Sequence, residues 1–182
     1  MVHLKNIRYV PEDSGILLAK ARKLCSNVNA IIRDSRVSTK YIEFDVSIDK
    51  SKLDELIEDL KALAPLDHAR YVIEEHLEKE EAIKLGISYF NNERFWECHE
   101  VLEGVWKKCY EGERDLIQGI ILVAAALVHY QKFENSICLS VFGRALDKLA
   151  NSGGMYHDIN VDALRQKVQT MKNLERISLF TI

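Results

Sequence analysis

The hydrophobic pattern of the chain changes its period once, near residues 66–80. Before that point, the segment YIEFDVSID at residues 41–49 alternates apolar and polar positions strictly, which predicts a half-buried β-strand. Weaker strand patterns cover residues 2–10, 29–37 and 68–73, and apolar residues at helical spacing predict helices over residues 14–28 and 53–63. The predicted order β-α-β-β-α-β is that of a ferredoxin-like α+β fold.

After residue 74 the apolar residues have helical spacing only. Five helices are expected, at about residues 83–92, 93–109, 114–132, 136–151 and 161–177. The third is apolar nearly all round, so we expect it at the centre of an all-α bundle. No convincing internal repeat is visible. The sequence therefore predicts a small ferredoxin-like domain at residues 1–75 and an all-α bundle of about five helices at residues 76–182.

Composition indicates a soluble globular protein: 47% of the 182 residues are hydrophobic and 29% are charged. The formal net charge of −3 gives no general attraction to nucleic acid or to anionic membranes. The longest apolar run, at residues 120–128, is too short to cross a bilayer, and the first residues lack the apolar core of a signal peptide. The four cysteines form no CxxC pair, so free thiols in a reducing cytoplasm are expected.

The segment NNERFWECHEVLEGVWK at residues 91–107 carries the candidate chemistry. On a helix, His99 and Glu103 are one turn apart, so both side chains address the same point. Such a pair can hold a divalent metal ion or support acid–base chemistry, because imidazole titrates near neutral pH. Glu100 and Glu103 are the candidate catalytic carboxylates. His129, on the next predicted helix, is the best candidate for a third metal ligand.

Two tryptophans and a glutamine complete the candidate site. Trp96 and Trp106 are expected to line a ligand pocket together with Gln118, which shares a face of its helix with His129. The same polar residues also fit a structural cluster, because the polar ends of an apolar helix need hydrogen-bond partners inside a bundle. Known metal motifs are incomplete: the chain reads HEVLE where a zincin needs HExxH, and the Glu-x-x-His copies of a ferritin-like site are absent.

The segment FNNERFWECHEVLEGVW, followed by RDLIQGIILVAAALVHYQK and GRALDKL, resembles the domain of unknown function 309 family. The resemblance covers about residues 80–178 and rests on three helices that agree in order and spacing. The positions that carry it are Phe95, Trp96, His99, Glu100, Glu103, Trp106, Gln118, Gly119 and His129. The family is known as a compact all-α bundle and is sometimes labelled a predicted metal-dependent hydrolase, a label that brings no substrate or mechanism.

Two functions follow as hypotheses. The first is a metal-assisted hydrolase in which His99, Glu103 and His129 hold the metal, which lowers the pKa of a bound water, and Glu100 acts as base. The second is a non-enzymatic ligand-binding or scaffold module in which the His/Glu/Trp cluster is structural. The expected partners are a small-molecule ligand and a second copy of the chain, since symmetric dimers are the commonest assemblies. Nothing in the sequence indicates a nucleic-acid or membrane partner.

Overall fold

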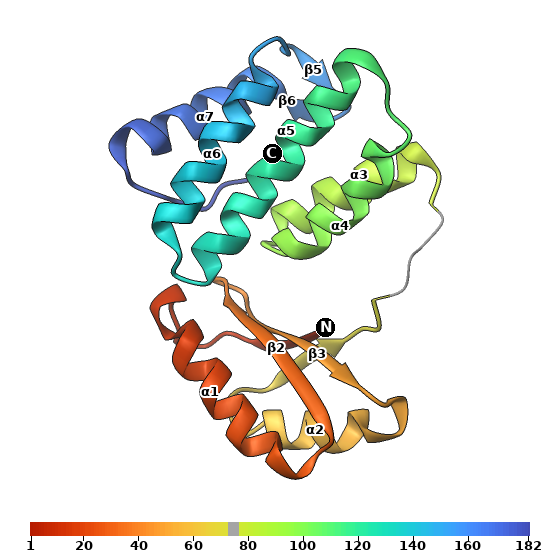
Figure 1. Cartoon of the computed structure of the whole chain (residues 1–182), viewed down its shortest axis with the longest axis vertical. Helices are drawn as coiled ribbons and strands as arrows, with labels where there is room; N and C mark the ends of the chain where they lie inside the picture. Colours follow the sequence, from red (N-terminus) through yellow and green to blue (C-terminus); the bar gives the residue numbers. More distant parts are fainter. Residues whose placement is uncertain (73–76) are drawn as a thin grey trace. The chain divides into compact units, whose positions relative to one another are not determined.

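The structure, a computed structural model, describes residues 1–72 and 77–182. The chain divides into two compact units (Figure 1). The α+β unit comprises Met1–Glu75 with Gln131–Phe133, and the helical unit comprises His76–Tyr130 with Glu134–Ile182. Residue 73, the last of a predicted strand, and residues 75 and 76, at the predicted domain boundary, lie outside the described residues.

The α+β unit is a small antiparallel sheet with two helices. Its strands and α-helices in chain order are β1 (Val2–Lys5), α1 (Ser14–Leu24), β2 (Ala30–Val37), β3 (Tyr41–Ile48), α2 (Leu53–Leu60) and β4 (Leu66–Ala69). Short 3-10 helices cover Pro11–Asp13, Cys25–Asn27 and Lys50–Lys52. The strand order is β2-β3-β1-β4, and each neighbouring pair is antiparallel. The predicted α+β arrangement is thus confirmed.

Side chains alternate between the two faces of the sheet, and the apolar ones lie on the face that packs against the two helices. Leu4, Ile42 and Phe44 are fully buried on this face, against Leu17 of α1 and Leu56 of α2. Figure 1 shows α1 and α2 along the same side of the sheet. The strict alternation predicted for β3 therefore corresponds to one apolar face and one polar face.

β1 is shorter than predicted because Asn6 starts a turn. The Asn6 side chain accepts the backbone N–H of Tyr9 at 2.8 Å and donates to the carbonyl of Tyr9 at 2.8 Å. An asparagine that bonds to the backbone ahead of it offers an alternative to sheet pairing. The strand predicted over residues 2–10 therefore covers only Val2–Lys5.

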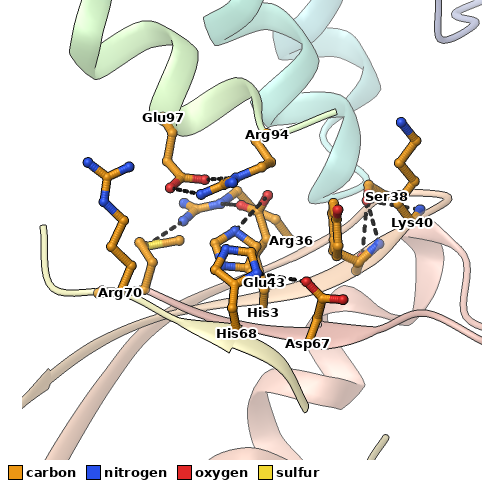
Figure 2. A network of polar contacts seen from close by, with 12 residues as sticks. His3, Arg36, Ser38, Lys40, Glu43, Asp67, His68, Arg70, Arg94 and Glu97 are labelled. Carbon is orange, nitrogen blue, oxygen red and sulfur yellow. Dashed lines mark hydrogen bonds and ion pairs between the residues drawn. The ribbon is translucent and has the colours of Figure 1, made fainter. Parts of the chain in front are cut away.

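The opposite face of the sheet carries a polar row, formed by Arg36, Glu43, His3 and His68 from four strands (Figure 2). Arg36 Nε donates to Glu43 Oε2 at 3.1 Å, and His3 Nε2 lies 3.6 Å from Glu43 Oε1. The rings of His3 and His68 stack with their centroids 4.3 Å apart. Arg36, Glu43 and His3 are buried. Charged groups in such a place need close partners of opposite charge, which the row supplies.

The helical unit contains the predicted set of helices and one small hairpin. Its elements are α3 (Lys79–Asn91), α4 (Phe95–Trp106), α5 (Glu111–Gln131), α6 (Asn135–Leu149), β5 (Met155–Tyr156), β6 (Ile159–Asn160) and α7 (Val161–Leu174). The hairpin of β5 and β6 was not predicted. Asn160 caps α7, as its side chain accepts the N–H of Ala163 at 2.9 Å.

The turn between α3 and α4 recurs 40 residues later (93 to 133) between α5 and α6. Glu93 in the first turn and Phe133 in the second both have a φ of 62°. In each turn the next residue donates its N–H at 2.9 Å to the carbonyl five positions earlier. Cys98 and Cys138 occupy the same buried position in the helices that follow. The two helical hairpins therefore share the geometry of this turn but few of their residues.

Close helix packing explains two of the glycines. A Cβ atom on Gly86 of α3 would lie 2.8 Å from the Leu102 side chain of α4, and one on Gly119 of α5 would lie 2.6 Å from Leu149 of α6. The apolar run of α5 is buried on nearly every side, as predicted. Among residues 1–72 and 77–182, no helix is long and apolar enough to span a membrane.

Candidate functional site

The outer side of α4 groups four side chains, called the α4 face below: Trp96, His99, Glu100 and Glu103. The imidazole of His99 stacks on the Trp96 ring, with the centroids 5.7 Å apart and the planes at 14°. Its Nδ1 lies 3.3 Å from Glu100 Oε1, and its Nε2 lies 3.6 Å from Glu103 Oε1. The structure thus places the imidazole between two carboxylates, one of them a helical turn away.

These side chains point outward because the other side of α4 fills the core. Phe95, Cys98 and Leu102 are buried there at helical spacing. The side chains of the α4 face remain accessible: 21% of His99, 42% of Glu100 and 45% of Glu103 is exposed. The α4 face is therefore reachable from solvent, unlike a sealed structural cluster.

α6 supplies an internal comparison for the α4 face. With the two turns aligned, the positions of Trp96, His99, Glu100 and Glu103 correspond to Ser136, Leu139, Ser140 and Gly143. Burial agrees at three of these four positions and differs at the first, where Trp96 is half-buried and Ser136 is exposed. The first turns of the two helices also differ, since Phe95 and Glu97 are buried whereas Asn135 and Ile137 are exposed. The same hairpin thus forms with serine, leucine and glycine at these positions. Its packing does not require an imidazole or carboxylates.

A third metal ligand does not join His99 and Glu103. His129 Nδ1 instead lies 2.5 Å from Glu134 Oε2, just past the end of α5. Gln118 is 11 residues before His129 on the same helix, which is about 16 Å along the axis. Within the described ranges, no three His, Cys, Asp or Glu side chains form a group that could hold a metal ion. Because a catalytic metal normally takes three protein ligands, the residues present do not fit one.

Trp106 lies at the other end of α4 from Trp96. Ten residues separate the two tryptophans, so they are about 15 Å apart along the axis. The guanidinium of Arg114 lies 4.1 Å from the centroid of the Trp106 ring, a cation–π contact. The expected pocket of Trp96, Trp106 and Gln118 is thus spread over distant turns, and Gln118 is half-buried in α5.

A second polar group, the Glu113 brace, joins Lys79, Glu113 and Tyr156. Glu113 Oε2 accepts from Lys79 Nζ at 2.7 Å, and Glu113 Oε1 accepts from the Tyr156 hydroxyl at 2.8 Å. The hydrogen bond from Lys79 holds the pKa of the Glu113 carboxyl below its usual range. Burial and the contact with Glu113 raise the pKa of Tyr156. All three groups therefore keep their ordinary charge at neutral pH, which fits a cross-link between elements rather than proton transfer.

The Glu113 brace has no local signal in the sequence. Its members are 34 and 43 positions apart, so no helical or strand spacing links them. Only the folded position of the β5–β6 hairpin brings Tyr156 to the first turn of α5. The polar row of the sheet also has no local signal in the sequence, because its members become neighbours only through the register between strands.

The four cysteines are free and buried, as predicted. Burial raises the pKa of Cys25 to about 11 and that of Cys138 to about 12, and it also raises the pKa of Cys98. A thiol that stays protonated at neutral pH is a poor nucleophile and a poor metal ligand. These cysteines are therefore core residues.

A scan against protein families matches residues 83–141 to the Domain of unknown function (DUF309), which confirms the resemblance found in the sequence. The match runs from α3 into α6 and includes the α4 face. Comparisons with curated proteins and with solved structures found no match. The family match carries no substrate, cofactor or reaction.

Proposed function

We propose that the helical unit is a non-enzymatic ligand-binding module and that the α4 face is its binding site. The internal comparison with α6 carries this proposal, because the second hairpin forms without any of the four side chains. Proteins depart from what their fold alone requires mainly at functional sites. Repeated helical hairpins also provide extended surfaces that commonly serve binding.

The chemistry of the α4 face favours a cationic group, such as a guanidinium or a protonated amine. Two exposed carboxylates flank the imidazole, and Glu103 Oε1 is 3.6 Å from His99 Nε2, beyond hydrogen-bond distance. Glu103 therefore keeps its capacity to accept from a ligand. A guanidinium can hydrogen-bond to carboxylates and stack on an aromatic ring, so it suits the combination of Trp96 and the two glutamates.

The metal-dependent hydrolase that the family label suggests has weaker support. Hydrolysis through a bound metal requires a donor set that His99 and Glu103 supply only in part, as described above. Without a metal, His99 could still exchange protons with Glu100 or Glu103. A glutamate can also act as a nucleophile, but the exposed positions of Glu100 and Glu103 favour contact with a ligand over covalent chemistry. Binding is therefore the function that these residues support best.

Titration with agmatine, a small molecule that carries both a guanidinium and an amine, tests the proposal. In a Trp106→Phe protein the remaining tryptophan is Trp96, so its fluorescence reports on the α4 face. We expect a saturable change in emission at low ionic strength. The double substitution Glu100→Gln/Glu103→Gln should weaken binding at least tenfold, because each lost charge-assisted hydrogen bond contributes about 1.5–3 kcal/mol.

A matched control removes two negative charges elsewhere. Glu12 and Glu81 are exposed and distant in sequence from the α4 face, and Glu12→Gln/Glu81→Gln should leave the affinity within about twofold, since screened charges contribute little. The proposal is abandoned if agmatine gives no saturable change. It is equally abandoned if both double variants bind as tightly as the parent.

We also propose that residues 1–75 form a ferredoxin-like domain and that residues 76–182 form a separate helical domain. The element order β1-α1-β2-β3-α2-β4 and the strand order β2-β3-β1-β4 support the first assignment. The four free thiols are consistent with a reducing compartment such as the cytoplasm. A symmetric homodimer remains the assembly that we propose, on general grounds alone.

A further inference from the structure

A cation lies one turn beyond the α4 face, at the end of the same helix. Trp106 follows Glu103 by three residues, so their Cβ atoms are about 5–6 Å apart. Trp106 also follows His99 by seven residues, which puts the two side chains on the same side of the helix. The guanidinium of the exposed Arg114, near the start of α5, lies 4.1 Å from the centroid of the Trp106 ring. The outer side of α4 thus carries carboxylates at its middle and a guanidinium at its end.

Arg114 keeps its hydrogen-bonding capacity for a ligand. Within residues 1–72 and 77–182, its guanidinium makes no hydrogen bond and no ion pair. The carboxylates on either side of it in the sequence have partners of their own. Glu113 belongs to the Glu113 brace, and Asp115 accepts a hydrogen bond from Lys148 at 2.8 Å. The N–H groups of the Arg114 guanidinium are therefore able to bind an anion from solution.

A second donor lies beside Arg114. The indole N–H of Trp106 is buried and has no hydrogen-bond partner in the part of the chain that the structure describes. A buried donor without an acceptor is costly, and an acceptor oxygen bound to Arg114 would lie near this one. The exposed Lys107 and Lys108 add positive charge at the same end of α4. These groups favour a carboxylate, which binds a guanidinium through two parallel hydrogen bonds.

We propose that the ligand of the α4 face is a small zwitterion that carries a carboxylate as well as a guanidinium, with arginine as the simplest example. This inference rests on the function proposed above. The guanidinium of the ligand would contact Glu100 and Glu103, and its carboxylate would bind Arg114. Trp106 is a positioning residue in this arrangement, because its ring holds the Arg114 guanidinium through the cation–π contact.

The carboxylate of the ligand distinguishes this inference from simple attraction to the glutamates. Agmatine has the guanidinium and the amine of arginine but lacks the carboxylate, so its net positive charge is larger. Attraction to Glu100 and Glu103 alone would therefore favour agmatine over arginine. A preference for the carboxylate requires a cation of the protein at the place where that group binds, and Arg114 supplies one.

Isothermal titration calorimetry of the full chain with arginine, argininamide and agmatine tests the inference. Argininamide has a neutral amide in place of the carboxylate and is otherwise the same molecule. At low ionic strength, arginine should bind about fivefold or more tightly than argininamide, because it gains charge-assisted hydrogen bonds to Arg114. Arg114→Gln should abolish this preference. The same variant should bind agmatine no more weakly than the parent, because agmatine has no group that requires Arg114.

A matched control removes another exposed arginine. Arg144→Gln, a change in α6, should leave the preference for arginine over argininamide as it is in the parent. Equal binding of arginine and argininamide would overturn the inference, and so would a preference that survives in Arg114→Gln. In both cases the binding of agmatine would still support the function proposed above. If neither agmatine nor arginine binds, that function and this inference fail together.

Discussion

Two glycines of the helical unit have opposite surroundings although both lie inside helices. Gly119 faces the buried Leu149 side chain so closely that an added Cβ would lie 2.6 Å from it. Gly104, on the exposed side of α4, has no atom within 4 Å of the position of a Cβ. The helix packing thus requires the first glycine and not the second.

Alanine substitutions should therefore change stability in opposite directions. Gly119→Ala should lower the free energy of unfolding by about 1–3 kcal/mol, because the extra methyl overpacks the contact between α5 and α6. Gly104→Ala should raise it by about 0.5–1 kcal/mol, because alanine loses less backbone entropy in a helix. Denaturant unfolding of both variants beside the parent measures this, and two changes of the same sign would contradict the packing described here.

At the same scale, the sequence could predict which residues meet within one helix but not which meet across helices. His99 and Glu103 are neighbours because helical geometry alone brings them one turn apart. The predicted third ligand, His129, lies on another helix, and the structure pairs its Nδ1 with Glu134 Oε2 at 2.5 Å. Sequence spacing predicts the angle of a side chain around the axis of its own helix. A metal site also requires that ligands from different helices lie at the same height along their axes.

Among the elements, the Glu113 brace ties the β5–β6 hairpin to the ends of two helices. It joins residues of α3, α5 and β5 through one carboxylate. The pKa of Glu113 is lowered in the folded protein. The stability that the brace contributes is thus present above the unfolded pKa of this carboxyl, and it is lost as the pH falls through the lower folded value.

Glu113→Gln should lower the free energy of unfolding at pH 7 by about 1 kcal/mol, a modest value because the pair is partly exposed. The difference from the parent should shrink as the pH falls below 4.5, the usual pKa of this group. Thermal unfolding from pH 7 to pH 3 measures both effects. Asp115→Asn, which removes an exposed pair with Lys148, is the control and should have little effect. If the stability difference between Glu113→Gln and the parent grew as the pH fell, the stabilising role assigned to the Glu113 carboxylate would be contradicted.

Long elements were predicted well because their periodicity is local. The helix predicted over residues 93–109 runs over Phe95–Trp106, and the strand predicted over residues 41–49 runs over Tyr41–Ile48. The hairpin of β5 and β6 has two residues in each strand, too few for any period. The polar row of the sheet was missed because its members meet only through the register between strands.

For the whole molecule, the internal repeat decides how the α4 face is interpreted. Two helical hairpins have the same turn, and only the first carries an aromatic ring, an imidazole and two carboxylates at the positions of the α4 face. A structural cluster would stabilise the fold, whereas a displayed binding site contributes little to it. The shared turn was not visible in the sequence because it consists of backbone geometry, with few shared residues.

The free energy of unfolding of a His99→Leu/Glu103→Gln protein tests this interpretation most directly. Leu139 already occupies the equivalent of position 99 in α6, and glutamine matches the shape of Glu103. We predict a value within about 0.5 kcal/mol of the parent, as for surface substitutions. A loss of about 1–3 kcal/mol would contradict the account, because the His99–Glu103 pair would then be part of the structural framework.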